Sequence, residues 1–426
     1  MVLQGYSGIR FFRCYLVVAC TLLGFVGVFN GIVDPFGLYY WVKVSGLNEK
    51  KPEFFNHLRM TKAHAVRFYR PDGVICGTSR AEYGLDPDHP AWKERGCRRV
   101  YNLAFSSCRI YELEQYMRHA YSHGPYRVAV LGLDLFMFDD QARCEAGFST
   151  ARLSLPEGRL LPTGWVHDLF VSLISYDALK KSIATLSSQD NPLLITYNRK
   201  GMRSPLSAQA RIVQRGGHRE ADGMGFEASA AEDQRAAFSF KKSMRYFRDI
   251  LDFCRSRGVD LRIFISPVHA RFLERLRVWG KWETYEQWKR ALVRTLAEEA
   301  GIAGAPAFPL WDFSGYCDRT GERFPAYGDR TTRMQWFWES SHYKKELGDL
   351  VLNKVLGVEK GNADRFGVRL DIQNIEEYLE AVKRDRAAYI ASHLDDVKDI
   401  WDRQAKHRPL KKKTGMTNGK TRYSKR

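Results

Sequence analysis

The stretch VICGTSR, residues 74–80, predicts a short buried strand that ends at a glycine and presents a serine in the turn behind it. A short apolar run followed by turn residues is typical of such a strand, and we expect a helix to begin beside Ser79. A side chain at this place is exposed, which suits a nucleophile. Whether Ser79 has that role depends on the base, the orienting acid and the oxyanion donors that the rest of the chain supplies.

Apolar runs like this one recur along the chain and predict further strands at 99–105, 126–131, 261–265 and 307–313. Apolar residues at helical spacing predict helices over 110–124, 239–258, 285–301 and 345–357. Strands that alternate with helices build a parallel sheet flanked by helices. We therefore predict an α/β fold whose ligands collect at the carboxyl ends of the strands.

The segment from Cys14 to Val33 carries no charge and is long enough to cross a hydrocarbon core of about 30 Å as a helix. Arg10 and Arg13 precede it, and no basic residue follows until Lys43. The positive-inside rule then places the N-terminus in the cytoplasm and the main domain outside, in the periplasm or its equivalent. The alternative, a cleaved signal peptide, lacks a convincing small-x-small cleavage site, so we predict a single-pass anchor in the cytoplasmic (inner) membrane.

These patterns divide the chain into six parts. We expect a cytoplasmic N-terminus (1–13), an anchor (14–33), a juxtamembrane lead-in (34–70), an α/β domain (71–358), a helical extension (359–407) and a basic disordered tail (408–426). Within the domain, residues 140–235 form an insertion that covers part of the site; it is helical near 165–186 and irregular over 189–233. The charged helical stretch 372–405 either packs on the domain or pairs with a partner helix.

Charge and cysteines exclude two classes of function. The formal net charge is +18, but eight of these charges lie in the tail and the remainder is interleaved with acids, so we expect no nucleic-acid partner. No two of the eight cysteines have CxxC spacing, and neither a structural zinc site nor a cofactor is expected. Six cysteines lie outside the anchor and could pair in an exported domain, with partners that the sequence does not assign.

A carboxylate and a histidine occur together just ahead of the helix at 345–357. In Glu339-x-x-His342 the carboxylate can fix the tautomer of the imidazole, whose other nitrogen is then available to a serine. Ser79 would be the nucleophile, His342 the general base and Glu339 the orienting acid. Taken alone, the same spacing also fits a capped helix start with a surface histidine.

In these features the sequence resembles the SGNH (GDSL-like) hydrolase superfamily over roughly residues 72–356. Gly77-Thr78-Ser79 stands where many members have Gly-Asp-Ser, and the stretch from Asn102 to Ser107 matches the Asn-x-x-x-Ser-Gly block. Gly132-Leu133-Asp134 corresponds to the Gly-x-Asn-Asp block, and Glu339-x-x-His342 to the final Asp-x-x-His. The resemblance implies a flavodoxin-like three-layer sheet and an oxyanion hole that involves Ser79, Asn102, Ser107 and the position of Asp134.

Two positions depart from the family pattern at the oxyanion hole. Ser107 replaces a glycine, which keeps the backbone donor if the dihedral angles permit. Asp134 replaces an asparagine donor, and an ionised carboxylate would repel an oxyanion. Arg80 and His269, which follow strand ends on the same side, are the candidate replacement donors.

The resemblance is greatest to the envelope-modifying subgroup, which includes alginate-type O-acetyltransferases and DltD-like proteins of teichoic-acid D-alanylation. It implies an acyl esterase or O-acyltransferase that acts on a cell-envelope polysaccharide, beside the lipid bilayer and a membrane acyl-transfer or export partner. The alternative is a non-catalytic scaffold that binds glycan or assembles an export complex. A third hypothesis, anchoring of a cytoplasmic partner, has only a dozen residues on that side to support it.

Overall fold

The computed structural model describes residues 2–154, 163–233, 238–358 and 366–407, so the predicted tail at 408–426 lies outside the described residues. The strands are β1 (Gly73–Cys76), β2 (Val100–Asn102), β3 (Val128–Leu133), β4 (Asp260–Ile265), β5 (Leu310–Asp312), β6 (Phe337–Glu339), β7 (His342–Tyr343) and β8 (Val368–Leu370). The helices before β4 are α1 (Val2–Val33), α2 (Glu53–Asn56), α3 (Leu58–Tyr69), α4 (Ser79–Gly84), α5 (Ala91–Glu94), α6 (Ile110–His123), η1 (Leu135–Phe138), η2 (Thr150–Arg152), α7 (Thr163–Ile174), α8 (Tyr176–Ser187), α9 (Leu206–Gln214), α10 (His218–Asp233) and α11 (Ser243–Ser256). The later helices are α12 (Ala270–Val278), α13 (Trp282–Ala303), α14 (Lys345–Val355), α15 (Ile375–Ser392) and α16 (Leu394–His407).

The described residues form a six-stranded sheet in the order β2-β1-β3-β4-β5-β8. The first five strands are parallel, and their order is that of flavodoxin-like doubly wound sheets. The predicted α/β class is therefore confirmed. The sheet extends past the predicted domain end at residue 358, because β8 pairs antiparallel with β5 through Leu310 and Leu370.

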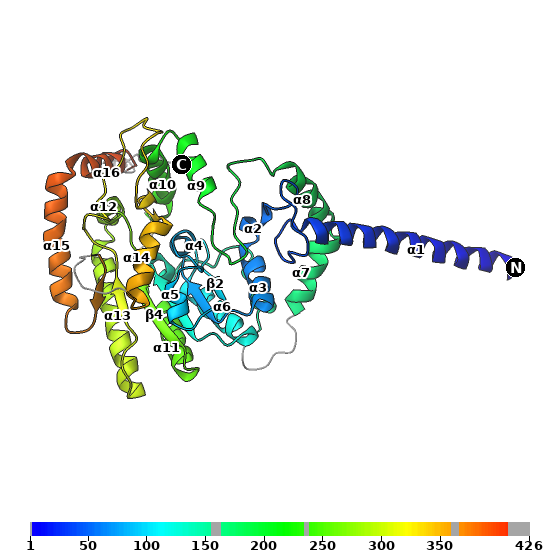
Figure 1. The fold of residues 1–426 in the computed structure, drawn as a ribbon, viewed down its shortest axis with the longest axis horizontal. Helices are drawn as coiled ribbons and strands as arrows, with labels where there is room; N and C mark the ends of the chain where they lie inside the picture. The colour runs from blue at the N-terminus through cyan, green and yellow to red at the C-terminus, as the bar shows by residue number, and fades with distance from the viewer. Residues whose placement is uncertain (1, 155–162, 234–237, 359–365, 408–426) are drawn as a thin grey trace, which may run out of the picture.

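Both faces of the sheet are buried, and alternate residues of each strand point to opposite faces. Val74 and Cys76 of β1 belong to one hydrophobic cluster, which α3, α6, α11 and α13 also line. Ile75 lies between them in sequence and belongs to the opposite cluster, which α4, α5 and α14 line. The carboxyl ends of the strands therefore emerge between two helical layers (Figure 1).

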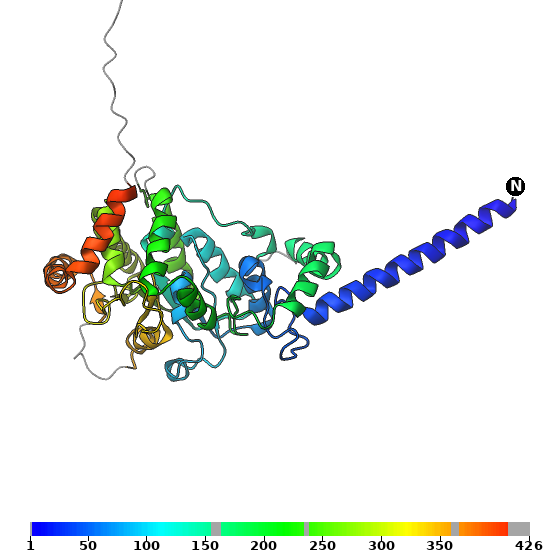
Figure 2. The same cartoon turned by 90° about the horizontal axis from the view of Figure 1, so that it is seen from above.

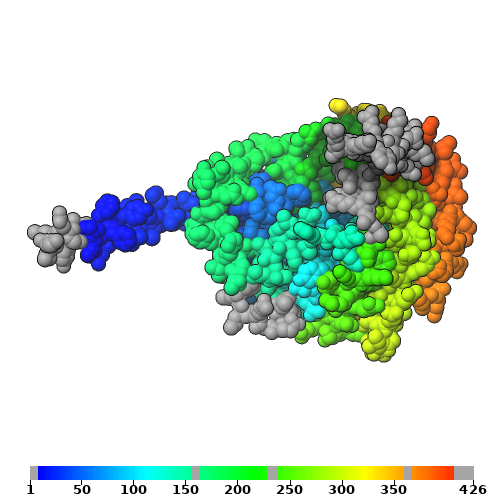
Figure 3. All heavy atoms as spheres, turned by 180° about the vertical axis from the view of Figure 1, so that it is seen from behind, coloured from blue at the N-terminus to red at the C-terminus, as the bar shows by residue number. Residues whose placement is uncertain are grey.

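The helix α1 projects from the domain and is long and apolar enough to cross a membrane over Gly8–Val33. Figure 2 shows it pointing away from the rest of the chain, at the end opposite to α15 and α16. Its last turns pack on α7 and α8, where Asn30 Nδ2 donates to the carbonyl of Leu173 (2.7 Å) and Asn30 Oδ1 accepts from Ser182 Oγ (2.8 Å). Figure 3 shows these insertion helices beside the base of α1.

The predicted insertion is more ordered than expected. Residues 163–187 are helical as predicted, but the stretch 189–233, predicted to be irregular, contains α9 and α10. The two helices pack on each other and on β6. Their burial depends on contacts with residues that are distant along the chain.

The C-terminal extension packs on the domain, which was one of the two predicted alternatives. Arg271 of α12 is 1% exposed and forms ion pairs with Asp222 (3.1 Å), Asp396 (2.9 Å) and Asp399 (2.5 Å). Burial raises the pKa of Asp222, but the guanidinium groups of Arg271 and Arg275 outweigh this effect and lower it to about 2. We call this set the Arg271 network; it joins α10, α12 and α16.

The helices α4 and α14 touch backbone to backbone at Gly84 and Gly348. A Cβ atom on Gly348 would lie 1.8 Å from the carbonyl oxygen of Gly84, a distance that no side chain tolerates. A Cβ atom on Gly84 would meet the ring of Tyr343 at 1.9 Å. Two glycines thus bring the helix that begins at Ser79 against the helix that follows His342.

Candidate active site

Ser79 lies at the carboxyl end of β1, where the chain turns sharply into α4. The turn is made at Gly77, whose φ is +152°, and a Cβ atom there would lie 2.9 Å from Ala81 Cβ and 3.1 Å from the carbonyl oxygen of Gly132. Glycine is therefore the residue that fits both the conformation and the close approach of β3. Thr78 caps the helix by accepting from the Arg80 N–H, and Ser79 is the first helical residue.

His342 and Glu339 lie on the β6–β7 hairpin and meet Ser79. The Ser79 Oγ is 2.8 Å from His342 Nε2, and His342 Nδ1 forms a short hydrogen bond with Glu339 Oε1. The carboxylate selects the tautomer with the proton on Nδ1, which leaves Nε2 to accept from the serine hydroxyl. Burial raises the pKa of Glu339, but the imidazole of His342 and the Ser341 N–H outweigh it and hold the pKa below its ordinary value.

The hairpin is held in place through Ser340, the residue between Glu339 and Ser341. The Ser340 N–H donates to Asp222 Oδ1 (3.1 Å), and its hydroxyl accepts from Arg275 Nη1 (3.0 Å). Its carbonyl accepts from the backbone N–H of His269 (3.0 Å). The position of His342 therefore depends on Asp222 and, through it, on the Arg271 network.

Ser79 and Ser107 are the two residues whose backbone N–H groups were predicted to bind an oxyanion. Ser107 has a φ of +56°, in the left-handed region where glycine is favoured. Ser79 and Ser107 both line the cavity. In the part of the chain that the structure describes, neither backbone N–H has a hydrogen-bond acceptor.

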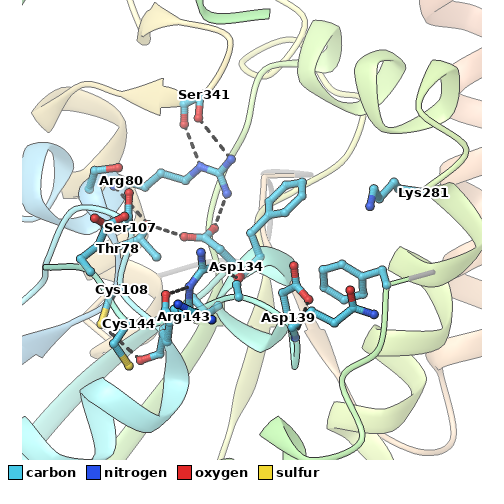
Figure 4. A pocket seen from close by; sticks show the side chains of 18 of the residues that line it. Thr78, Arg80, Ser107, Cys108, Asp134, Asp139, Arg143, Cys144, Lys281 and Ser341 are labelled. Atoms are coloured by element: carbon cyan, nitrogen blue, oxygen red, sulfur yellow. Dashed lines mark hydrogen bonds and ion pairs between the residues drawn. The ribbon is translucent and has the colours of Figure 1, made fainter. Parts of the chain in front are cut away.

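Asp134 is buried at the end of β3 and is paired with Arg80. Arg80 Nη1 donates to Asp134 Oδ1, while its Nε and Nη2 donate to the carbonyl (2.9 Å) and the hydroxyl (3.2 Å) of Ser341. Thr78 Oγ1 donates to the other carboxylate oxygen. Figure 4 shows the guanidinium between Asp134 and Ser341. Arg80 thus offsets the charge of Asp134 and joins the end of β3 to the hairpin.

Two predicted donors do not reach the cavity. The prediction that His269 replaces the oxyanion donor is wrong: its Nε2 hydrogen-bonds to the carbonyl of Glu322 (2.6 Å), its Nδ1 accepts from the Arg271 N–H (3.1 Å), and burial lowers its pKa to about 4. Asn102 is also buried, and its amide donates to the carbonyls of Ala81 (2.9 Å) and Leu85 (3.0 Å). Asn102 therefore holds α4 against β2 rather than binding a ligand.

The main cavity has a volume of about 880 Å³ and opens over Ser79 and His342. Its lining includes the aromatic residues Phe272 and Trp279. It also includes the basic residues Arg143 and Lys281, which Figure 4 labels. These four residues were not predicted as site residues. Phe272 lies on α12, Trp279 and Lys281 follow that helix, and Arg143 lies in the loop after η1, so no sequence motif marks them.

A second cavity, of about 310 Å³, shares Phe272, Ser341 and His342 with the main cavity. It does not include Ser79. Its other walls come from α9 and α10 of the insertion and from Tyr83, whose ring lies edge-on to the imidazole of His342 at 5.4 Å between centroids. The spacing of Arg211 and Arg215, four residues apart, is the sequence signal that could have indicated this wall.

The site brings together a serine hydroxyl, an imidazole and a carboxylate. Among the described residues, no group of three His, Cys, Asp or Glu side chains could hold a metal ion, and all eight cysteines are free. Cys76 and Cys254 are buried. Comparison with known proteins gives no family: no family model matches the chain, and no curated protein matches it significantly.

Proposed function

We propose that this chain is a membrane-anchored serine esterase or O-acyltransferase. The observation that carries the proposal is the continuous contact from Ser79 Oγ to His342 Nε2 (2.8 Å) and from His342 Nδ1 to Glu339. A hydroxyl, a base and an orienting carboxylate in this order are what acyl transfer requires. Their positions at the ends of β1 and the β6–β7 hairpin place them at the carboxyl edge of the sheet, where ligands bind in such folds.

The proposed reaction has two steps, acylation of Ser79 and deacylation. Ser79 Oγ attacks the carbonyl carbon of an ester, its proton passes to His342 Nε2, and the leaving alcohol takes that proton as its bond to the carbonyl breaks. A second hydroxyl, from water or from a sugar, then gives its proton to His342 Nε2 as its oxygen bonds to the acyl carbon, and Ser79 Oγ leaves and recovers that proton. Water as the acceptor makes the protein an esterase, and a sugar makes it a transferase.

Charge that develops on the carbonyl oxygen would be stabilised by the backbone N–H groups of Ser79 and Ser107. Each such donor contributes on the order of 3 kcal/mol to the transition state. Asp134 supplies no donor, but its ion pair with Arg80 offsets the repulsion that a lone carboxylate would exert. The proposed oxyanion hole therefore has two donors.

We extend the proposal to an SGNH-like protein of the cell envelope that acts on a polysaccharide. The order of Ser79, Ser107, Asp134 and His342 along the chain and at the strand ends supports the resemblance. The apolar helix α1, with Arg10 and Arg13 before it, supports an anchor with the domain on the extracytoplasmic side. A membrane acyl-transfer or export partner would supply the acyl group or the glycan.

One observation favours a second function, a non-catalytic scaffold that binds glycan. Asp134 stands where a third oxyanion donor would be, and losing such a donor lowers the rate about 10²- to 10³-fold. A scaffold would keep the cavity and the fold without turnover. The Ser79–His342–Glu339 contacts serve no purpose in a scaffold, which is why we rank it second.

Active-site labelling of the full chain in detergent tests the proposal. We expect a fluorophosphonate probe to label Ser79 and p-nitrophenyl acetate to be hydrolysed, and both reactions to be lost in Ser79→Ala and His342→Ala. His167→Ala, at a side chain that is 74% exposed, is the matched control and should behave as the parent protein does. A folded parent protein with neither labelling nor hydrolysis would refute catalysis and favour the scaffold.

A further inference from the structure

We infer that the second cavity is a subsite for an anionic group of the acyl acceptor, a carboxylate or a phosphate. The inference rests on the proposed acyl transfer for the role of the ligand, but not for its binding. It starts from the arginines that line this cavity: Arg203, Arg211, Arg215 and Arg275. The one carboxylate in the described lining is Glu339, which is engaged with His342.

Two of the four arginines are buried in the lining and already have carboxylate partners. Arg203 is 7% exposed and lies 4.0 Å from Glu82, and Arg275 is 3% exposed and lies 3.5 Å from Asp222. The guanidinium of Arg203 also stacks over the ring of Tyr83, at 4.3 Å from its centroid. These contacts hold the two guanidinium groups in place in the lining of the cavity.

The other two arginines, at the end of α9, have no such partner. Arg211 is half-buried and donates to the carbonyl of Leu193 (3.3 Å), and Arg215 is exposed. Within the described parts of the chain, neither forms an ion pair with a carboxylate. Arg211 and Arg215 are four residues apart and so share one face of the helix, an arrangement in which like charges repel.

The electrostatics of this wall favour an anion. Burial, together with the charges of Arg203 and Arg215, holds the pKa of Arg211 below its ordinary value. A ligand with a negative charge would relieve this repulsion. The planar guanidinium fork matches the oxygens of a carboxylate or a phosphate and can bind them through two parallel hydrogen bonds.

The position of the cavity identifies which reactant it holds. It reaches His342 but not Ser79 or Ser107, so a molecule in it lies beside the base and away from the oxyanion donors. The acyl donor must place its carbonyl in the main cavity, whereas the acceptor needs only to bring a hydroxyl to His342. That hydroxyl gives its proton to Nε2, its oxygen bonds to the acyl carbon, and Ser79 Oγ leaves and recovers the proton.

Calorimetric titration of the full chain in detergent, at constant ionic strength, tests the inference. The probes are methyl β-glucuronide for a carboxylate, glucose 6-phosphate for a phosphate, and methyl β-glucoside as the neutral control. We expect at least one anionic probe to bind at least tenfold more tightly than the glucoside. Arg211→Gln and Arg215→Gln should each weaken its binding about tenfold. Arg384→Gln, an exposed arginine on α15, should leave it unchanged.

The outcomes separate this inference from the proposed esterase or transferase. Equal binding of all three probes, or equal binding by the parent protein and both α9 variants, would overturn the anionic subsite. Binding is measured without turnover, so Ser79→Ala should bind the anionic probe as tightly as the parent protein. If p-nitrophenyl acetate is not hydrolysed but the arginine-dependent binding persists, the catalytic proposal fails and the subsite stands. Circular dichroism of each variant shows that it is folded.

Discussion

The buried ion pair between Arg80 and Asp134 allows a quantitative prediction about stability and activity. Arg80 is 7% exposed and Asp134 is 5% exposed, and they form an ion pair at the point where β3 meets the β6–β7 hairpin. We consider Arg80→Met, Asp134→Asn and the double variant. Each single change leaves its partner buried without an opposite charge, whereas the double change removes both.

The expected loss of stability follows from the burial of both side chains. Breaking a buried ion pair by removing one partner costs about 3–5 kcal/mol, since the remaining group has lost its solvent and its partner. Removing both should cost less than the sum, with a coupling energy of about 1.5–3 kcal/mol. Arg80→Met also frees the carbonyl of Ser341, next to His342, and a displacement of about 1 Å there would lower kcat about 10²-fold.

Chemical denaturation of the full chain in detergent gives the free energies of unfolding, and p-nitrophenyl acetate hydrolysis gives the rates. The exposed pair Arg290–Glu376, at 2.7 Å with side chains 31% and 67% exposed, is the matched control. Its coupling energy should be below about 1 kcal/mol. If the losses of stability caused by Arg80→Met and Asp134→Asn add within about 0.5 kcal/mol, the ion pair does not join β3 to the hairpin as described.

Three further predictions concern the frame of the site. Ser107→Gly should raise the free energy of unfolding by about 1 kcal/mol, because Ser107 has a φ of +56°, and should keep turnover, because the N–H remains; a thermal melt showing destabilisation would contradict this. Gly348→Ala should push α14 from α4 at Gly84, with a cost of about 1–3 kcal/mol or more and loss of fluorophosphonate labelling. Gly301→Ala, whose Cβ would meet nothing within 4 Å, is its control. The pKa of His269 falls from its ordinary value of 6.5 to about 4, so folding favours the neutral imidazole; the resulting stability is present above pH 6.5 and is lost as pH falls toward 4. We expect the free energy of unfolding of His269→Asn, measured by denaturation at several pH values, to fall by about 3 kcal/mol less over this window than that of the parent protein. An equal fall in both proteins would refute the assignment.

The parts of the site that the sequence predicted are those that local pattern determines. A buried strand that ends in Gly-Thr-Ser and a carboxylate three residues before His342 are visible without knowledge of the fold. The strand order then brings both ends to one edge of the sheet. The predicted contact between Ser79 and His342 is present, although its catalytic role stays a prediction.

The parts that were missed depend on contacts between distant residues. Arg80 had been considered as an oxyanion donor, but its partners Asp134 and Ser341 lie 54 and 261 residues away in sequence. His269 was placed correctly at a strand end, yet it turns its ring to Glu322 and away from the cavity. No periodic pattern reports which way such a side chain points.

The C-terminal helix α16 affects when the site can form. The hairpin that carries His342 is bonded to Asp222, and Asp222 is ion-paired with Arg271. Arg271 in turn is ion-paired with Asp396 and Asp399 of α16. A ribosome makes Ser79 and His342 before it makes these last two acids. We therefore expect the site to acquire its final geometry late in synthesis, after α16 has been made and has packed on α12. If the domain is exported, as proposed, that order would keep Ser79 and His342 unaligned until translocation is complete.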